Sequence, residues 1–277
     1  MSTLWQRVLS ALVLAPLVIL AVLVLPNSWV AGLLGAIVLL GAMEWARLSG
    51  LDGERIQLIW SGVLAVAIGM VALWQRDIGL SLILFGAAWW AVTLFRLLLA
   101  ARHSVAATHG VHWPRLLDGF FVLLPAWYAL TKIHGLAHIG PFLLLYCLIL
   151  IWGADSFAYF SGRAFGRHKL APNISPGKTL EGVVGALLGA LLIAYVGHGL
   201  VARSYQVGLW SWLALGLIVV LASIAGDLFE SLVKRERGMK DSGTLIPGHG
   251  GVMDRIDSLT AAGPVFAAGL IWLGVLQ

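Results

Sequence analysis

Apolar stretches long enough to cross a lipid bilayer follow one another along nearly the whole chain. A helix needs about 17 to 25 mostly apolar residues to span the hydrocarbon layer, and about nine windows of the sequence meet this length. They lie near residues 8–25, 28–46, 57–75, 79–99, 118–134, 138–161, 181–202, 209–232 and 259–276. Apolar residues make up 60% of the chain and charged residues 11%, which excludes a soluble domain. The sequence therefore predicts an all-α, polytopic integral membrane protein with about nine transmembrane helices.

Basic residues are distributed unevenly between the two ends of these predicted helices. If the N-terminus is cytosolic, only Arg76, Lys132 and Arg203 of the 18 Lys and Arg residues fall on the opposite side. This bias predicts a cytosolic N-terminus and, for nine spans, an external C-terminus. The polar loops after the sixth and eighth windows then face the cytosol from the inner (cytoplasmic) membrane. The net charge of +5 suits anionic headgroups or phosphate-bearing substrates, and a nucleic-acid partner is not expected.

Acidic residues concentrate in the second half of the chain. Of the 13 carboxylates, eight lie beyond residue 150. We therefore divide the chain into N-terminal transmembrane helices, residues 1–117, and a C-terminal transmembrane catalytic region, residues 118–277. Cys147 is the only cysteine, which excludes an intrachain disulfide and argues against a thiolate metal site.

A polar stripe lies near the end of the eighth window. It consists of Asp227, Glu230, Ser231 and Lys234. Their spacing puts them on one face of a helix that is otherwise largely apolar. Placing an ionisable group at membrane depth costs free energy, so such a group is first interpreted as part of a functional site. The structural alternative is an ion pair of Asp227 or Glu230 with Lys234 that only holds helices together.

A glycine-rich segment, residues 247–251, follows this stripe. Glycine lets the backbone approach a ligand closely and present N–H groups to an anion, so we expect Gly250 and Gly251 to bind phosphate. His249 is expected to bind phosphate or order the loop, because a phosphate nucleophile is already anionic and needs no general base. The basic residues expected to hold phosphate oxygens are Lys234, Arg235, Lys240 and Arg255.

Carboxylates beside this segment could hold a metal ion. Mg²⁺ prefers hard oxygen ligands, commonly one or two carboxylates together with water and substrate phosphate. Asp227 and Asp254 are the natural ligands, and Asp257 is a third candidate. The alternatives for Asp257 are pairing with Arg255, or capping of the final helix by Asp257 or Ser258.

A second polar constellation lies in residues 153–182, between the sixth and seventh windows. Asp155 stands on the sixth helix, and a basic loop then leads to Ser175, Lys178 and Glu181. Helix N-termini attract phosphate, so Lys178 with nearby N–H groups could hold a triphosphate. The alternative is ordinary helix capping by Ser175 or Thr179.

Two other polar groups receive structural interpretations. Glu44 and Arg47, at the end of the second window, are expected to be a surface ion pair. The closely spaced histidines at 109 and 112 and at 134 and 138 have no carboxylate or cysteine nearby in the sequence, so a zinc site is not expected.

Residues 231–257, SLVKRERGMKDSGTLIPGHGGVMDRID, resemble the signature of the phosphatidate cytidylyltransferase family, also called CDP-diacylglycerol synthases. The charged residues and glycines of this segment stand in the family's order and spacing, and Asp155 and residues 175–181 are similar as well. Leu180 departs from the pattern, since many relatives have an aromatic residue there. The resemblance covers the C-terminal half in detail and the rest in hydrophobic layout.

The resemblance implies a multi-spanning, homodimeric enzyme that converts CTP and phosphatidate to CDP-diacylglycerol and pyrophosphate at the cytosolic leaflet of the bilayer. It also implies that a monovalent cation such as K⁺ shares the acidic site with Mg²⁺. The matching residues are assigned to catalysis (Lys234, Arg235, Lys240, His249, Arg255), to substrate binding (Asp155, Ser175, Lys178, Glu181, Ser231, Asp241, Gly250, Gly251) and to metal binding (Asp227, Asp254, Asp257).

Two other functions use similar residues. In a transporter or channel, carboxylates such as Asp155 and Asp227 would form an ion path together with Lys234, but such a path does not need a glycine-rich basic loop. A membrane CDP-alcohol phosphotransferase or lipid kinase would also use carboxylates and Mg²⁺. The phosphotransferase motif Asp-Gly-x-x-Ala-Arg is absent, because Asp118 and Gly119 are followed by Phe-Phe-Val-Leu.

Overall fold

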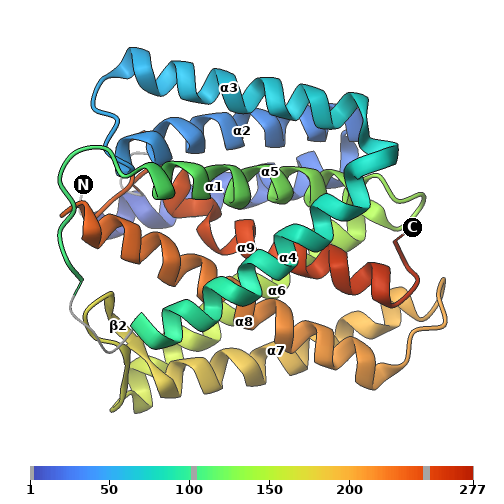
Figure 1. Cartoon of the computed structure of the whole chain (residues 1–277). Coiled ribbons are helices and arrows are strands. Elements are labelled where there is room, and N and C mark those ends of the chain that lie inside the picture. Colours follow the sequence, from blue (N-terminus) through green and yellow to red (C-terminus); the bar gives the residue numbers. More distant parts are fainter. Residues whose placement is uncertain (1–2, 101–104, 246–249, 277) are drawn as a thin grey trace.

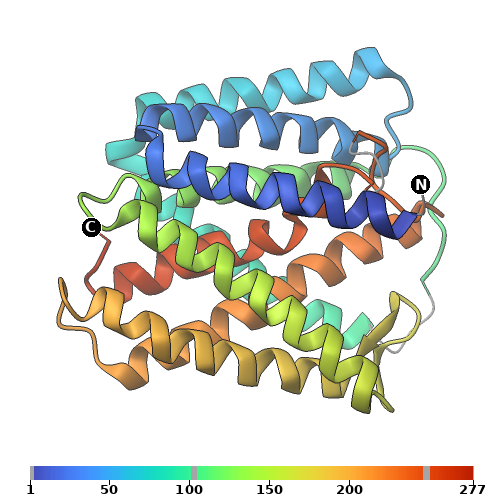
Figure 2. The ribbon, with the colours of Figure 1, turned by 180° about the vertical axis from the view of Figure 1, so that it is seen from behind.

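The computed structural model describes residues 3–100, 105–245 and 250–276. Over these residues the chain forms nine α-helices that lie side by side in one bundle, with a small hairpin at one end (Figures 1 and 2). The helices are α1 (Thr3–Val24), α2 (Asn27–Leu48), α3 (Glu54–Leu73), α4 (Gln75–Ala100), α5 (Trp113–His134), α6 (Gly140–Phe165), α7 (Leu180–Val201), α8 (Leu209–Glu236) and α9 (Met253–Trp272). Each helix overlaps one of the predicted windows, so the all-α architecture is confirmed.

Seven helices in the described part of the chain are long and apolar enough to cross a membrane. They are α2, α3, the segment Ile78–Leu99 of α4, and α5 to α8. In α1 a shorter apolar segment, Leu12–Val24, is found. The first two turns of α9 contain Asp254, Arg255 and Asp257, and this helix is not among the seven. The prediction of a polytopic membrane protein is confirmed.

Helix α9 lies in the middle of the bundle, where it packs against α2, α4, α5, α6 and α8 (Figure 1). Small buried residues such as Ala261, Gly263 and Ala267 allow neighbouring helices to approach it closely. The apolar core contains Trp45 of α2 and Phe266 of α9, and so includes residues on both sides of the predicted boundary at 117 and 118. That boundary stays a prediction.

The polar segment between α6 and α7 forms a hairpin that the apolar pattern does not predict. Strand β1 (Lys169–Ala171) pairs antiparallel with β2 (Ser175–Thr179), with Lys169 opposite Thr179. Ala171 and Ile174 are buried and anchor the hairpin on the bundle. The Thr179 hydroxyl accepts a hydrogen bond from the Gly182 N–H at 3.1 Å, so the capping alternative holds for Thr179.

The ends of α8 and α9 differ from the predicted windows. α8 continues to Glu236, and α9 begins at Met253, before the window at 259–276. Because the N-cap residue of α9 is Val252, the hypothesis that Asp257 or Ser258 caps this helix is wrong. The helix can begin there because the carboxylate of Glu44, far away in the sequence, accepts from the free N–H groups of Val252 and Met253.

Candidate active site

Polar residues gather at the end of the bundle where α2 and α8 end, α9 begins and the hairpin lies (the left-hand end in Figure 1). Neighbouring helices run in opposite directions, which brings segments far apart in the sequence to this one end. The described residues that the sequence assigns to a site lie at or near it. His249 lies outside the described residues.

Lys234 forms the centre of a network of buried charges. Its Nζ lies 2.6 Å from Glu230 Oε2 on the same helix and 2.6 Å from Asp254 Oδ1 on α9. The Glu230 side chain is 1% exposed and the Asp254 side chain 6% exposed, so these charges are largely removed from solvent. Of the two ion pairs offered as the structural alternative, the one between Glu230 and Lys234 is observed, and the same lysine also links α8 to α9.

Asp254 is hydrogen-bonded through both of its oxygens. While Oδ1 pairs with Lys234, Oδ2 accepts from the backbone N–H groups of Ser242 at 2.9 Å and of Gly251 at 2.8 Å. The Ser242 hydroxyl also lies 3.0 Å from Oδ2. Asp254 thus fastens the segment between α8 and α9 at two points and holds Lys234 in place.

Asp227 faces the hairpin. Its Oδ2 lies 2.7 Å from Lys178 Nζ on β2, and its Oδ1 is 3.3 Å from the Ser231 hydroxyl. The carboxylates of Asp155 and Asp257 both lie close enough to Asp227 to repel it electrostatically. Helices α6, α8 and α9 therefore each contribute one carboxylate to an acidic group of three residues. Lys178 on β2 compensates part of the negative charge of this group.

The acidic group fits a cation that binds through few protein ligands. In the described ranges, no group of three or more His, Cys, Asp or Glu side chains could form a metal cage. Mg²⁺ commonly uses only one or two carboxylates and takes its other ligands from water and substrate phosphate. Asp227, which is 34% exposed and repelled by two other carboxylates, fits this role. Asp254 fits it less well, because only 6% of its side chain is exposed and two backbone N–H groups hold one of its oxygens.

The N-terminus of α9 binds an anion from the chain itself. The N–H groups of Val252 and Met253 donate to the carboxylate of Glu44, at 3.0 Å and 2.8 Å. The expectation that Glu44 and Arg47 form a surface pair is therefore wrong, since Arg47 donates through Nη2 to the Ser242 carbonyl oxygen. The physical reason is that α2 packs beside α9, where free helix N–H groups need acceptors.

The remaining predicted site residues divide into two groups. Some hold the hairpin: Arg235 Nε donates to the Ile174 carbonyl oxygen at 3.3 Å, and Glu181 lies 2.7 Å from His168 Nδ1. Ser175 is half-buried on β2. The others lie on the segment that follows α8 or at the start of α9: Lys240, Asp241 and Arg255 are exposed, and Gly250 has φ +84°.

Two residues of this network are missed by sequence reasoning. Glu44 could have been found, because an acidic residue inside an apolar window is costly without a partner. Ser242 has no such signal, yet it is fully buried and its hydroxyl lies 2.8 Å from Glu44 Oε2.

A cavity of about 420 Å³ lies beside a second ion network, between α4, α5, α8 and the connector that precedes α5. Arg115 binds Glu236 through Nε and Nη2, at 2.8 Å and 2.7 Å, and lies 3.1 Å from Asp118. The Thr108 N–H donates to the Glu236 carbonyl oxygen at 2.8 Å. These contacts fasten the connector to the end of α8.

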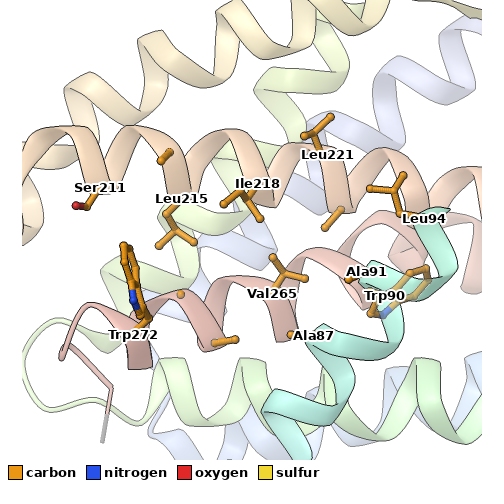
Figure 3. Close-up of a pocket in the computed structure, with 14 residues that line it drawn as sticks. Ala87, Trp90, Ala91, Leu94, Ser211, Leu215, Ile218, Leu221, Val265 and Trp272 are labelled. Atoms are coloured by element: carbon orange, nitrogen blue, oxygen red, sulfur yellow. The ribbon is translucent and has the colours of Figure 1, made fainter. Parts of the chain in front are cut away.

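A separate apolar groove of about 440 Å³ lies between α4, α8 and α9. Figure 3 shows Trp90 and Trp272 toward its two ends, with Leu215, Ile218 and Val265 between them. None of the predicted site residues lines it. The predicted site residues in the described part of the chain therefore lie at the polar end of the bundle and not in this groove.

Comparisons with known proteins agree with the family resemblance of residues 231–257. The family model described as the cytidylyltransferase family matches residues 5–272. The chain is 44% identical to a phosphatidate cytidylyltransferase of Pseudomonas aeruginosa, over 96% of each chain. It is 41% identical to one from Haemophilus influenzae, over 95% of this chain and 96% of the relative. A protein of the same name from Brucella abortus is 33% identical over 95% of this chain and 91% of its own length.

Proposed function

The chain belongs to the cytidylyltransferase family, and on this premise we propose that it transfers the cytidylyl group of CTP to phosphatidate. The products are CDP-diacylglycerol and pyrophosphate, as phospholipid biosynthesis requires. The observation that carries the proposal is that the whole-chain similarity coincides with a site in which lysines and carboxylates meet at one end of a membrane bundle. Neither a transporter nor a CDP-alcohol phosphotransferase is among the relatives described above.

The proposed reaction is an in-line displacement at the α-phosphorus of CTP. A phosphate oxygen of phosphatidate forms the new P–O bond, and the bond between the α-phosphorus and the oxygen bridging to the β-phosphorus breaks. Pyrophosphate leaves with that electron pair. Because the attacking phosphate is already anionic near neutral pH, the site needs to neutralise charge and position the two substrates rather than abstract a proton.

The two lysine–carboxylate pairs are suited to different tasks. Lys178 and Asp227 are 25% and 34% exposed, so both can reach a bound triphosphate. Lys234 and Asp254 are 12% and 6% exposed, which suits them to orienting the more exposed residues of the site. Mg²⁺ on Asp227, with Asp254 and Asp257 as further proposed ligands, would supply charge neutralisation for the phosphates, and K⁺ is proposed to share the acidic site.

The other residues complete the proposed substrate site. Arg235, Lys240 and Arg255 offer cations to the departing pyrophosphate, with His249 as a phosphate-binding residue. Substrate binding is proposed for Asp155, Ser175, Lys178, Glu181, Ser231, Asp241, Gly250 and Gly251.

Pyrophosphate release tests the proposed function. Purified protein in detergent is supplied with CTP, Mg²⁺ and phosphatidate, and each is omitted in turn. We expect release only when all three are present, because the metal and both substrates take part in one displacement. Release without phosphatidate would indicate hydrolysis of CTP, and no release from verified folded protein would contradict the proposal.

We propose that the site faces the cytosol and that the N-terminus is cytosolic. The uneven distribution of Lys and Arg supports this orientation. Cysteine labelling tests it in a Cys147→Ala background, with one new cysteine at the exposed Pro172 of the hairpin or at the exposed Arg203 beyond α7. In intact cells an impermeant thiol reagent should label Arg203→Cys only, and Pro172→Cys should react after permeabilisation. The reverse pattern would contradict the orientation.

We also propose that the enzyme is a homodimer, as the resemblance implies. The molar mass of the protein in detergent, measured by light scattering, tests this. A mass near twice the 29.7 kDa of one chain is expected, and a monomeric mass would contradict it.

A further inference from the structure

One carboxylate from the N-terminal helices is bound by the segment that leads into α9. Glu44 Oε1 accepts from the Val252 N–H at 3.0 Å, and Glu44 Oε2 accepts from the Met253 N–H at 2.8 Å. Glu44 and Val252 are 208 positions apart along the chain. These N–H groups lie at the start of a helix, where no intrahelical acceptor exists, so Glu44 supplies the acceptors and the negative charge that a helix N-terminus favours.

The backbone around Glu44 leaves space that only glycine provides. A Cβ atom on Gly243 would collide with Glu44 Oε1, and one on Gly251 would collide with Glu44 Oε2. Both glycines lie in the described parts of the connection between α8 and α9, residues 237–245 and 250–252. These parts of the backbone pass close to the carboxylate, as the backbone of a nest does around a bound anion.

Ser242 connects Glu44 to the catalytic network. Its hydroxyl lies 2.8 Å from Glu44 Oε2 and 3.0 Å from Asp254 Oδ2, and its single proton is donated to one of them at a time. Asp254 in turn lies 2.6 Å from Lys234. Arg47, one turn after Glu44, donates to the Ser242 carbonyl oxygen and holds the same residue from the backbone side.

We propose that Glu44 is a positioning residue for the active site. Its carboxylate fixes the segment that presents Asp254 to Lys234, so that α2 completes a site whose reacting groups come from the C-terminal half. The inference rests on the proposed function for its kinetic test. The contact itself can be measured without turnover, which separates a failure of this inference from a failure of the proposed function.

The Glu44→Gln variant tests the role. Glutamine keeps the length of the side chain but offers one acceptor oxygen, and its NH₂ group faces donors. We expect kcat to fall about 10-fold to 100-fold, as for residues that orient metal or catalytic ligands, with little change in KM for CTP. Glu44→Asp keeps both acceptor oxygens at a shorter reach and should recover part of the lost kcat.

Amide hydrogen exchange gives the second readout. The N–H groups of Val252 and Met253 have Glu44 as their acceptor, so a peptide that contains them should exchange faster in Glu44→Gln. The matched control is Asp52→Asn, which removes an exposed carboxylate that pairs with Arg237, the first residue after α8, and that accepts from neither Val252 nor Met253. The control should leave both kcat and this exchange unchanged.

Several outcomes would overturn the proposal. Wild-type kcat in folded Glu44→Gln contradicts it, whether or not exchange accelerates, because faster exchange alone indicates a purely structural role. If Glu44→Gln does not fold, Glu44→Asp is measured in its place, because the shorter side chain draws both acceptor oxygens away from the N–H groups of Val252 and Met253. A folded Glu44→Asp enzyme with wild-type kcat would then contradict the proposal.

Discussion

Asp227→Asn is expected to abolish cytidylyl transfer and to leave a folded, membrane-inserted protein. The change keeps the shape of the side chain but removes the charge that faces Lys178 and that we propose binds the metal. Loss of one electrostatic contact to the reacting phosphates costs roughly 100-fold to 1,000-fold in kcat. Because Asp155 and Asp257 both repel Asp227, the neutral variant should unfold at no lower a temperature than the wild type.

The measurement is the rate of CDP-diacylglycerol formation together with the midpoint of thermal unfolding in detergent. Asp254→Asn is the comparison variant. It should also lose activity and remain folded, but with a lower midpoint, because Asp254 holds Lys234, Ser242 and Gly251. Full activity in either variant would refute its assignment as a metal ligand.

Lys234→Met is expected to damage both folding and activity. The substitution leaves Glu230 and Asp254 as buried carboxylates without their common cation. Removing one partner of a buried ion pair typically costs about 3–5 kcal/mol, because the remaining charge stays uncompensated. We expect a large drop in the unfolding midpoint and no detectable transfer. Lys169→Met, which removes an exposed lysine from β1, should leave the midpoint unchanged.

A double variant separates the two effects of Lys234. Adding Glu230→Gln to Lys234→Met removes one of the unpaired charges and should restore part of the lost stability. Activity should not return, because the cation beside Asp254 is still missing. Recovery of transfer in the double variant would show that Lys234 serves only to neutralise Glu230.

The bundle could be predicted from the sequence because its main determinant is local. Each helix that must cross hydrocarbon carries its own apolar window, and each window overlaps one observed helix. The polar stripe on α8 could also be predicted from local sequence, since helical spacing alone places Asp227, Glu230 and Lys234 on one face. The spacing left Asp227 or Glu230 open as the partner of Lys234, and the structure shows the pair with Glu230.

Contacts between distant segments could not be predicted from local pattern. Nothing in the spacing around Glu44 indicates that its partners are Val252 and Met253, because only the packing of α2 beside α9 brings them together. The prediction that Gly250 and Gly251 bind phosphate stays a prediction, and the Gly251 N–H already donates to Asp254 Oδ2. The hairpin was missed because its strands are short and β2 contains proline and glycine, which are rare in strands.

We propose that this polar end of the bundle transfers the cytidylyl group to a lipid phosphate. The most direct test is to supply CTP labelled at either the α- or the γ-phosphorus, with phosphatidate and Mg²⁺, and to separate the lipid from the aqueous products. We expect the α-label to appear in the lipid and the γ-label in pyrophosphate. An α-label that stays in water-soluble CMP, or a γ-label that enters the lipid, would contradict it.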